Sequence, residues 1–381
     1  MSLIRAGRDL RVDFFRGVAL WWIFTDHMPG DILGSLSLRN FAFCDATEVF
    51  VLLAGYAGAI VYGRGMDRHG WLYAGADAVK RAWTLYIAHI FLFVVFSAQV
   101  AYSASMLDRS DYLDEIHIDV LGEDPYRALL GALTLQFQPG YLNILPMYIV
   151  LLLLFAVALP LLRWPAILGA LSFTLYAAAR AIPLHLPSWS GAGWFFNPLA
   201  WQLLFVIGAI FSYAPFKPPL PPRALDFIAA TIVVLGVFLQ IFVSPSPQLA
   251  AHLPTFVSDT LLSVDKDSLH PFRLISILAL TWLTARLVQP SARWLGTSGA
   301  APFVLMGQHS LPVFCASIGL SFLGRMIMEQ DESLAAQIVV NAAGFAAMSA
   351  VGAVAAWYRI KGQVPRPART ALPSASRADT A

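Results

Sequence analysis

Long apolar segments that carry no charged residue restrict this chain to a membrane-embedded fold. Residues 144–162 and 228–243 contain no Asp, Glu, Lys or Arg. A helix of roughly 20 apolar residues crosses the hydrocarbon core of a bilayer, and it satisfies its own backbone hydrogen bonds there. Charged residues make up 13% of the sequence, whereas a soluble protein carries about 25%. The sequence therefore predicts an all-α, polytopic bundle of transmembrane helices.

Ten segments are apolar and long enough to contribute a span to this bundle. They are residues 12–32, 46–63, 82–102, 143–162, 165–182, 199–213, 224–243, 271–288, 302–324 and 335–357. We expect residues 1–358 to form one transmembrane domain. Residues 359–381 are rich in Pro, Ala, Ser and Arg, which predicts a disordered cytoplasmic tail. A further apolar segment, 128–137, is too short to cross and predicts a re-entrant or interfacial helix.

The distribution of basic residues predicts that both termini are cytoplasmic. With ten spans and an inside start, 17 of the 25 Lys and Arg residues fall on the inner side and five fall in outer loops. This is the asymmetry of the positive-inside rule. Three arginines precede the first apolar run without a small-residue cleavage site, which predicts an uncleaved first span. The outer segment 103–127, here called the acidic loop, carries seven acidic residues.

The composition also excludes some partners and sites. A net charge of +2 is too small to indicate nucleic acid as a partner. The two cysteines, Cys44 and Cys315, provide neither a ligand cluster nor a disulfide framework. The eight histidines show no metal-ligand spacing, so we expect no metal site.

Four ionisable residues lie in the first apolar segment, where a charge is costly and usually functional. They are Asp13, Arg16, Asp26 and His27. At 100° per residue, the eleven steps from Arg16 to His27 place both on one helix face, about 16 Å apart. Asp13 falls within ~60° of that face, whereas Asp26 points about 100° away. One face thus joins a cytoplasmic cation to a group that can accept a proton at neutral pH. In the simpler interpretation, Arg16 extends to the inner interface and His27 only ends the helix.

Several motifs resemble those of the type 3 membrane acyltransferases. Arg16 and His27 match the Arg-x10-His signature in the first helix of that family. Residues 50–56, Phe-Val-Leu-Leu-Ala-Gly-Tyr, are similar to its second-helix motif, and residues 307–314 look like a motif of a late helix. These enzymes move acyl groups from cytoplasmic acyl-CoA to sugars on the far side of the membrane.

Residues 45–51 and 143–148 look most like the OpgC branch, whose members succinylate osmoregulated periplasmic glucans. The resemblance covers nearly the whole chain and implies ten spans with both ends inside. It implies transfer of an acyl group, with succinyl favoured, to hydroxyls of a periplasmic glucan. The expected location is the bacterial inner (cytoplasmic) membrane. Acyl-CoA is the expected co-substrate, with the glycan acceptor and the lipid bilayer as partners and no bound cofactor.

The resemblance and the helix geometry together assign roles in the first span. His27 would take the proton from a glucan hydroxyl, which then attacks the thioester carbonyl. Arg16 would line the acyl-CoA channel, with Asp13 orienting it. Asp26 would act on the local electric field rather than as a direct partner of His27.

Five further residues are secondary candidates. Asp45 and Glu48 can hydrogen-bond sugar hydroxyls or pair with the candidate base, or they can simply complement a helix N-terminus. Lys80 and Arg81 can hold the nucleotide end of CoA, or only anchor the inner side of the membrane. His309 lies in a polar stretch within the ninth expected span and suits an interhelical hydrogen bond better than chemistry.

Two alternatives to a glucan succinyltransferase stay open. The first is an O-acetyltransferase of another surface glycan. The second is a proton-coupled exporter of a glycan or lipid, which would also keep an Asp and a His within a span. Such transporters often contain broken helices in paired halves, and the sequence shows no internal repeat of that kind.

Overall fold

The computed structural model describes residues 9–182, 184–214, 218–243 and 264–363, and every regular element in these residues is helical. Six helical stretches are long and apolar enough to cross a membrane. They are Ala46–His69, Trp71–Leu107, Ile144–Arg163, Pro222–Val243, Ser310–Gln330 and Leu334–Lys361. The prediction of an all-α, multi-pass membrane protein is thereby confirmed.

The four remaining expected spans coincide with helices of 16 or 17 residues. These are α1 (Leu10–Asp26), α10 (Pro165–Ala181), α11 (Pro198–Tyr213) and α15 (Pro271–Leu287). At 1.5 Å per residue they reach about 25 Å, slightly less than the ~30 Å hydrocarbon core. The total of ten spans and the side of each terminus therefore stay predictions.

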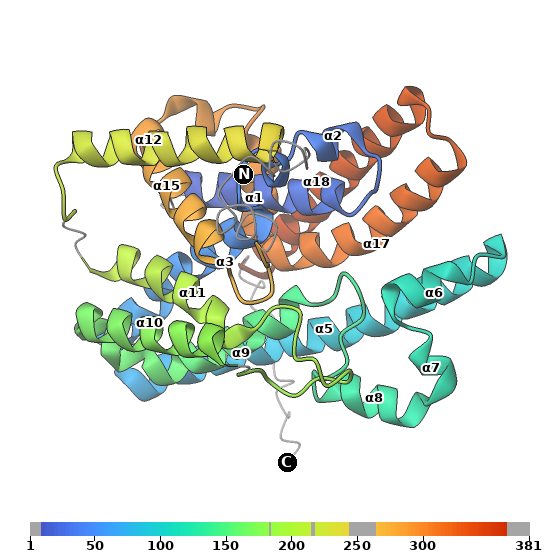
Figure 1. Cartoon of the computed structure of the whole chain (residues 1–381), viewed down its shortest axis with the longest axis horizontal. Helices are drawn as coiled ribbons and strands as arrows, with labels where there is room; N and C mark the ends of the chain where they lie inside the picture. Colours follow the sequence, from blue (N-terminus) through green and yellow to red (C-terminus); the bar gives the residue numbers. More distant parts are fainter. Residues whose placement is uncertain (1–8, 183, 215–217, 244–263, 364–381) are drawn as a thin grey trace, which may run out of the picture.

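The long helices run mostly along the longest axis of the molecule and form two groups (Figure 1). One group contains α5 (Trp71–Leu107), α9 (Ile144–Ala158), α10 and α11. The other contains α1, α12 (Pro222–Phe238), α15, α17 (Ser310–Gln330) and α18 (Leu334–Gln363). Helix α3 (Ala46–Gly58) packs against α11 in the first group and against α1 in the second. Polar side chains on α1 and α3 therefore lie inside the protein.

Reciprocal glycines fix α1 against α16 (Ala301–Gln308). A Cβ atom at Gly17 would lie 1.9 Å from the carbonyl oxygen of Phe303, and one at Gly307 would lie 1.7 Å from that of Asp13. Only hydrogen fits at either position, so the two backbones touch directly. Small residues allow such close approach between membrane helices, and here the contact fixes the helix that carries Arg16 and His27.

Several helix boundaries differ from the sequence-based expectation. Helix α1 ends at Asp26 rather than near residue 32, so His27 caps the helix instead of lying within it. Helix α5 begins at Trp71 rather than near residue 82 and is about 55 Å long. Its first turns carry charged residues, which hid them from a search for apolar runs. Helix α18 continues to Gln363, so the tail expected from residue 359 begins as helix. The rest of that tail, residues 364–381, lies outside the described residues.

The ninth expected span, residues 302–324, is not one continuous helix. It breaks at His309, where α16 ends and α17 begins. The short segment 128–137 overlaps α8 (Pro125–Leu133), whose nine residues are too few to cross a bilayer. Its re-entrant or interfacial position stays a prediction.

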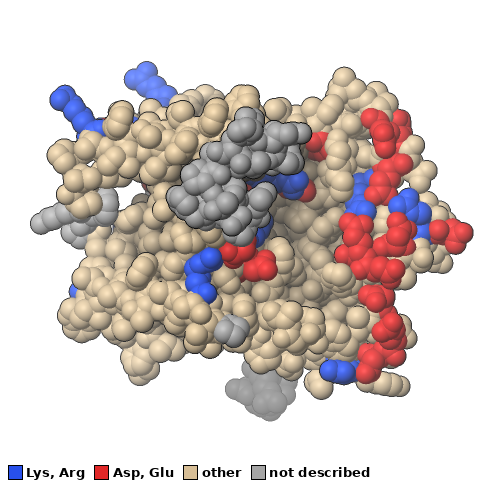
Figure 2. Space-filling model, viewed as in Figure 1, with Lys and Arg blue, Asp and Glu red and all other residues tan. Residues whose placement is uncertain are grey.

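The acidic loop lies at one end of the molecule. Figure 2 shows acidic side chains gathered over the end that carries α6 (Asp111–Ile116), α7 (Val120–Glu123) and α8 in Figure 1. The C-terminus of α5 and the N-terminus of α8 border this loop in the sequence. This is the end that the charge distribution predicts to be outside.

Candidate active site

His27 directly follows the last residue of α1 and is its C-cap. The ring Nδ1 atom lies 2.5 Å from the carbonyl oxygen of Ile23. A carbonyl oxygen only accepts hydrogen bonds, so Nδ1 must carry the ring proton. In the neutral ring, Nε2 then keeps its lone pair and can accept a proton. The helix end thus fixes the tautomer that a general base requires.

Asp26, the acid at the end of α1, bonds to groups other than the His27 ring. Asp26 Oδ1 accepts a hydrogen bond from Ser37 Oγ at 2.5 Å and lies 3.9 Å from Arg39 Nε. Among the residues that the structure describes, no hydrogen bond joins Asp26 to His27. The described partners of Asp26 are thus Ser37 and Arg39, and its expected divergence from His27 stays a prediction.

Arg16 is buried rather than extended toward the inner interface. Only 9% of the residue is exposed. Its Nη2 atom donates to the carbonyl oxygen of Leu53 at 2.9 Å, and its guanidinium lies 5.8 Å from the ring centroid of Phe50. Both partners belong to α3. Arg16 is therefore held inside the protein against α3, rather than extended into solvent.

Asp13 connects the first helix to the break between α16 and α17. It has no exposed surface, and its Oδ2 atom accepts a hydrogen bond from Gln308 Nε2 at 3.0 Å. His309 follows Gln308 and forms the junction of the two helices. The structure thus brings Asp13, Arg16 and His309 into one region, where α1 meets α3 and α16.

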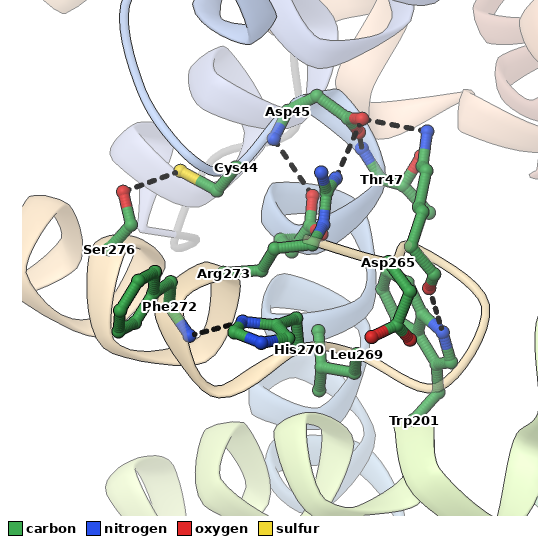
Figure 3. Close-up of polar contacts among 12 residues, drawn as sticks. Cys44, Asp45, Thr47, Trp201, Asp265, Leu269, His270, Phe272, Arg273 and Ser276 are labelled. Carbon is green, nitrogen blue, oxygen red and sulfur yellow. Dashed lines mark hydrogen bonds and ion pairs between the residues drawn. The ribbon is translucent and has the colours of Figure 1, made fainter. Parts of the chain in front are cut away.

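A buried network of charged groups surrounds the N-terminus of α3 (Figure 3). Asp45 is the N-cap and forms a capping box with Glu48, whose Oε2 accepts from the Asp45 backbone at 2.8 Å. Arg273 of α15 lies 2.9 Å from Asp45 Oδ2 and 2.6 Å from Glu48 Oε1. Lys266 Nζ lies 2.7 Å from Asp45 Oδ2, and Asp45 Oδ1 accepts from the backbone of Thr47.

All four carboxylate oxygens of Asp45 and Glu48 are therefore occupied by the protein. These contacts favour the interpretation as a charged helix N-terminus, and a role of the two acids toward sugar hydroxyls or His27 stays a prediction. Lys266 and Asp45 still lie within electrostatic range of His27. Arg273 and Lys266 were not among the predicted site residues, although a buried arginine in an apolar segment is itself a signal for a partner.

Lys80 and Arg81 lie apart from the other candidates. They belong to the interior of α5 rather than to its start, and Lys80 is exposed while Arg81 is half-buried. Phe96 lies 16 residues further along the same helix, about 24 Å away, and its ring packs near Tyr141, a neighbour of His27. Any ligand that contacts both Lys80 and the surroundings of His27 must therefore be long.

A cavity of about 390 Å³ lies beside the loop that carries Lys266. Arg180 and Asp265 form an ion pair of 3.2 Å at its wall. On the same loop, burial and the nearby charge of Asp265 raise the pKa of Asp267. The lining residues are Ala179, Arg180, Ala181, Ile182, His185, Asp265 and Ser268. The cavity is polar and large enough for a small hydrophilic group.

The fold and this site define a multi-pass helical membrane protein with a candidate acid–base group at the end of its first helix. The sequence matches the family described as OpgC protein over residues 8–360. The chain therefore belongs to the OpgC protein family. Membership indicates an enzyme of the acyltransferase type that modifies a glucan by acyl transfer. No curated protein and no solved structure matches the chain.

Proposed function

We propose that this protein transfers an acyl group, with succinyl favoured, from cytoplasmic acyl-CoA to hydroxyls of a periplasmic glucan in a bacterial inner membrane. Family membership supports acyl transfer to a glucan. The observation that carries the chemical assignment is the contact between His27 Nδ1 and the Ile23 carbonyl oxygen. It leaves Nε2 as a proton acceptor at the end of a buried helix.

In the proposed reaction, His27 Nε2 removes the proton from a glucan hydroxyl while the hydroxyl oxygen attacks the thioester carbonyl carbon. The C–S bond breaks, and the imidazolium returns its proton to the leaving CoA thiolate. The products are an O-acyl ester and free CoA. General-base catalysis of this kind typically contributes ~10²–10⁴-fold to the rate.

The other residues of the first helix act on the donor side in this proposal. Arg16 is held between α1 and α3, where its fixed charge can meet the polar arm of acyl-CoA as it passes from the cytoplasm. Asp13 acts through the α16–α17 junction by its bond to Gln308. Lys80 is exposed on α5 and can bind a CoA phosphate from the inner side.

The direct experiment measures CoA release by the purified full-length protein in detergent with a glucan acceptor. Succinyl-CoA and acetyl-CoA are compared as donors, and mass spectrometry of the glucan identifies the product. Wild-type protein should release CoA only with acceptor present, and His27→Ala should lower kcat by at least ~10². His69→Ala removes an exposed histidine at the end of α4 (Arg64–His69) and serves as the matched control.

Two results would count against the proposal. If well-folded His27→Ala transfers acyl groups at a near-native rate, His27 is not the base. If the wild-type protein turns over no acyl-CoA with any glucan, the exporter alternative gains support. The helix break at His309 and the buried Asp13 on α1 are compatible with it. A proteoliposome flux assay would then decide.

A further inference from the structure

Tyr141 has a backbone conformation that few bulky residues adopt. Its φ angle is +72°, in the left-handed region that suits glycine and asparagine. Such a conformation persists only where the surrounding structure holds it, and it is found most often at functional sites. Tyr141 precedes α9 and lies against the end of α1. Its side chain contacts His27 on one side and Phe96 and Arg325 on the other.

Tyr141 contacts His27 in two ways. The phenol hydroxyl donates a hydrogen bond to the backbone carbonyl oxygen of His27 at 3.2 Å. The phenol ring packs edge-on against the imidazole, with ring centroids 4.4 Å apart and an interplanar angle of 71°. The bond from Nδ1 to Ile23 fixes one edge of the imidazole. The Tyr141 ring limits rotation about the remaining free torsion.

Tyr141 is itself supported from behind by α5 and α17. The ring of Phe96 lies 5.8 Å away, and Arg325 Nη1 lies 3.5 Å from the Tyr141 hydroxyl oxygen and donates to it. Arg325 is buried and cannot move freely, because its guanidinium bonds both Glu115 oxygens at 2.7 and 2.5 Å and Glu329 at 2.6 Å. Glu115 belongs to the acidic loop.

We propose that Tyr141 is the positioning residue for the catalytic histidine, and that Arg325 sets its position. In this arrangement the acidic loop is connected to the imidazole through Glu115, Arg325 and Tyr141 in turn. The inference rests on the proposed function, because it assigns a role in the same reaction. Tyr141 holds the Nε2 lone pair in the direction of the acceptor hydroxyl. A displacement of about 1 Å of a reacting group costs on the order of 10²-fold in rate.

The experiment measures kcat and KM for both substrates in Tyr141→Phe and Tyr141→Leu. Phe keeps the ring and loses the hydroxyl, so kcat should fall about 5-fold to 10-fold, the effect of one hydrogen bond. Leu also loses the ring contact, and kcat should fall about 10²-fold. KM for acyl-CoA should not change in either variant. Tyr86→Phe is the matched control, because the Tyr86 hydroxyl also donates to a backbone carbonyl, that of Leu133 at 2.9 Å.

A double-mutant cycle tests the role of Arg325. Arg325→Lys keeps the charge and loses the planar fork that bonds Tyr141 and the two carboxylates. It should lower kcat in the wild-type background and cause no further loss in Tyr141→Phe, since the receiving hydroxyl is gone. A purely structural role predicts equal losses in both backgrounds.

Tyr141→Phe with native kcat and native thermal stability would overturn the proposal, and so would an equal loss of kcat in Tyr86→Phe. If Tyr141→Leu fails to fold, Tyr141→Phe still decides. The proposed function fails separately, through an inactive wild-type protein or an active His27→Ala variant.

Discussion

Arg273 Nε lies 2.6 Å from a carboxylate oxygen of Glu48, and Glu48 has no exposed surface. The pair joins α15 to α3, and Asp45 accepts from the same guanidinium (Figure 3). Removing the arginine leaves a buried carboxylate without compensation, which typically costs about 3–5 kcal/mol. The geometry of this network therefore determines the stability of the α3 N-terminus.

We expect Arg273→Ala to lower the thermal unfolding temperature in detergent strongly, and Arg273→Lys to lower it less. Arg286 provides the control on the same helix, because it pairs with Asp226 at 3.1 Å in a half-exposed position. Exposed ion pairs contribute little to stability, so Arg286→Ala should unfold close to the wild-type temperature. Equal effects of the two alanine variants would contradict the buried network.

The glycine contact between α1 and α16 leads to a second prediction. Gly17→Ala places a methyl group 1.9 Å from the Phe303 carbonyl oxygen, so the helices must separate. Overpacking of this kind costs about 1–3 kcal/mol or more. We expect lower thermal stability together with lower kcat, because α1 carries the candidate base. Gly299→Ala is the control, since nothing lies within 4 Å of its Cβ position. An unaltered Gly17→Ala protein would refute the close contact.

Much of the fold could be predicted from the sequence, because apolar length and helical period are local properties. The long spans and the short helix after residue 125 follow from counting residues along a helix. Asp13 and Arg16 are both buried on α1, but they bond to different helices, α16 and α3. The tautomer of His27 was not predictable, because it depends on a backbone bond at the helix end.

The partners across the fold could not be predicted, because they depend on contacts between distant segments. Arg273 is 225 residues from Glu48, and no local pattern selects one buried acid over another. The break at His309 is an exception, because Pro312 has no N–H to donate to the carbonyl of Gln308 four residues earlier. The left-handed backbone at Tyr141 could not be predicted either, because Tyr141 is neither glycine nor asparagine, the residues that usually adopt it.

A third prediction concerns a buried histidine in α5. His89 has no exposed surface, and neither ring nitrogen has a hydrogen-bond partner among the described residues. An unsatisfied buried polar group costs ~1–3 kcal/mol, so His89→Leu should raise the unfolding temperature. Ser317→Ala is the comparison, because that buried hydroxyl does donate, to the Phe314 carbonyl at 2.8 Å. A destabilised His89→Leu protein would contradict the assignment of an unsatisfied ring.

Topology is tested by reporter fusions. The positive-inside pattern predicts that a reporter fused after residue 110 lies outside and one fused after residue 220 lies inside. Alkaline phosphatase activity at the first site and green fluorescence at the second would agree with ten spans. A cytoplasmic signal at residue 110 would reverse the orientation and place the acidic loop on the donor side.

The final prediction separates the role of Arg16 from that of His27. Arg16→Lys keeps the charge and loses the planar guanidinium that bonds Leu53 and stacks near Phe50. If Arg16 contacts the donor, this change should raise KM for acyl-CoA about 10-fold, the value of one charge-assisted hydrogen bond. At saturating donor, kcat should fall much less than in His27→Ala.

Arg11→Lys is the matched control for this prediction. Arg11 lies on the same helix, and its guanidinium also donates to a backbone carbonyl, that of Val288 at 2.9 Å, as well as to Asp9. Arg11→Lys loses the same guanidinium fork as Arg16→Lys, but at a different position on the helix. The KM for acyl-CoA should therefore stay unchanged in Arg11→Lys. A fall in kcat with unchanged donor KM in Arg16→Lys would instead place Arg16 among the groups that stabilise the transition state.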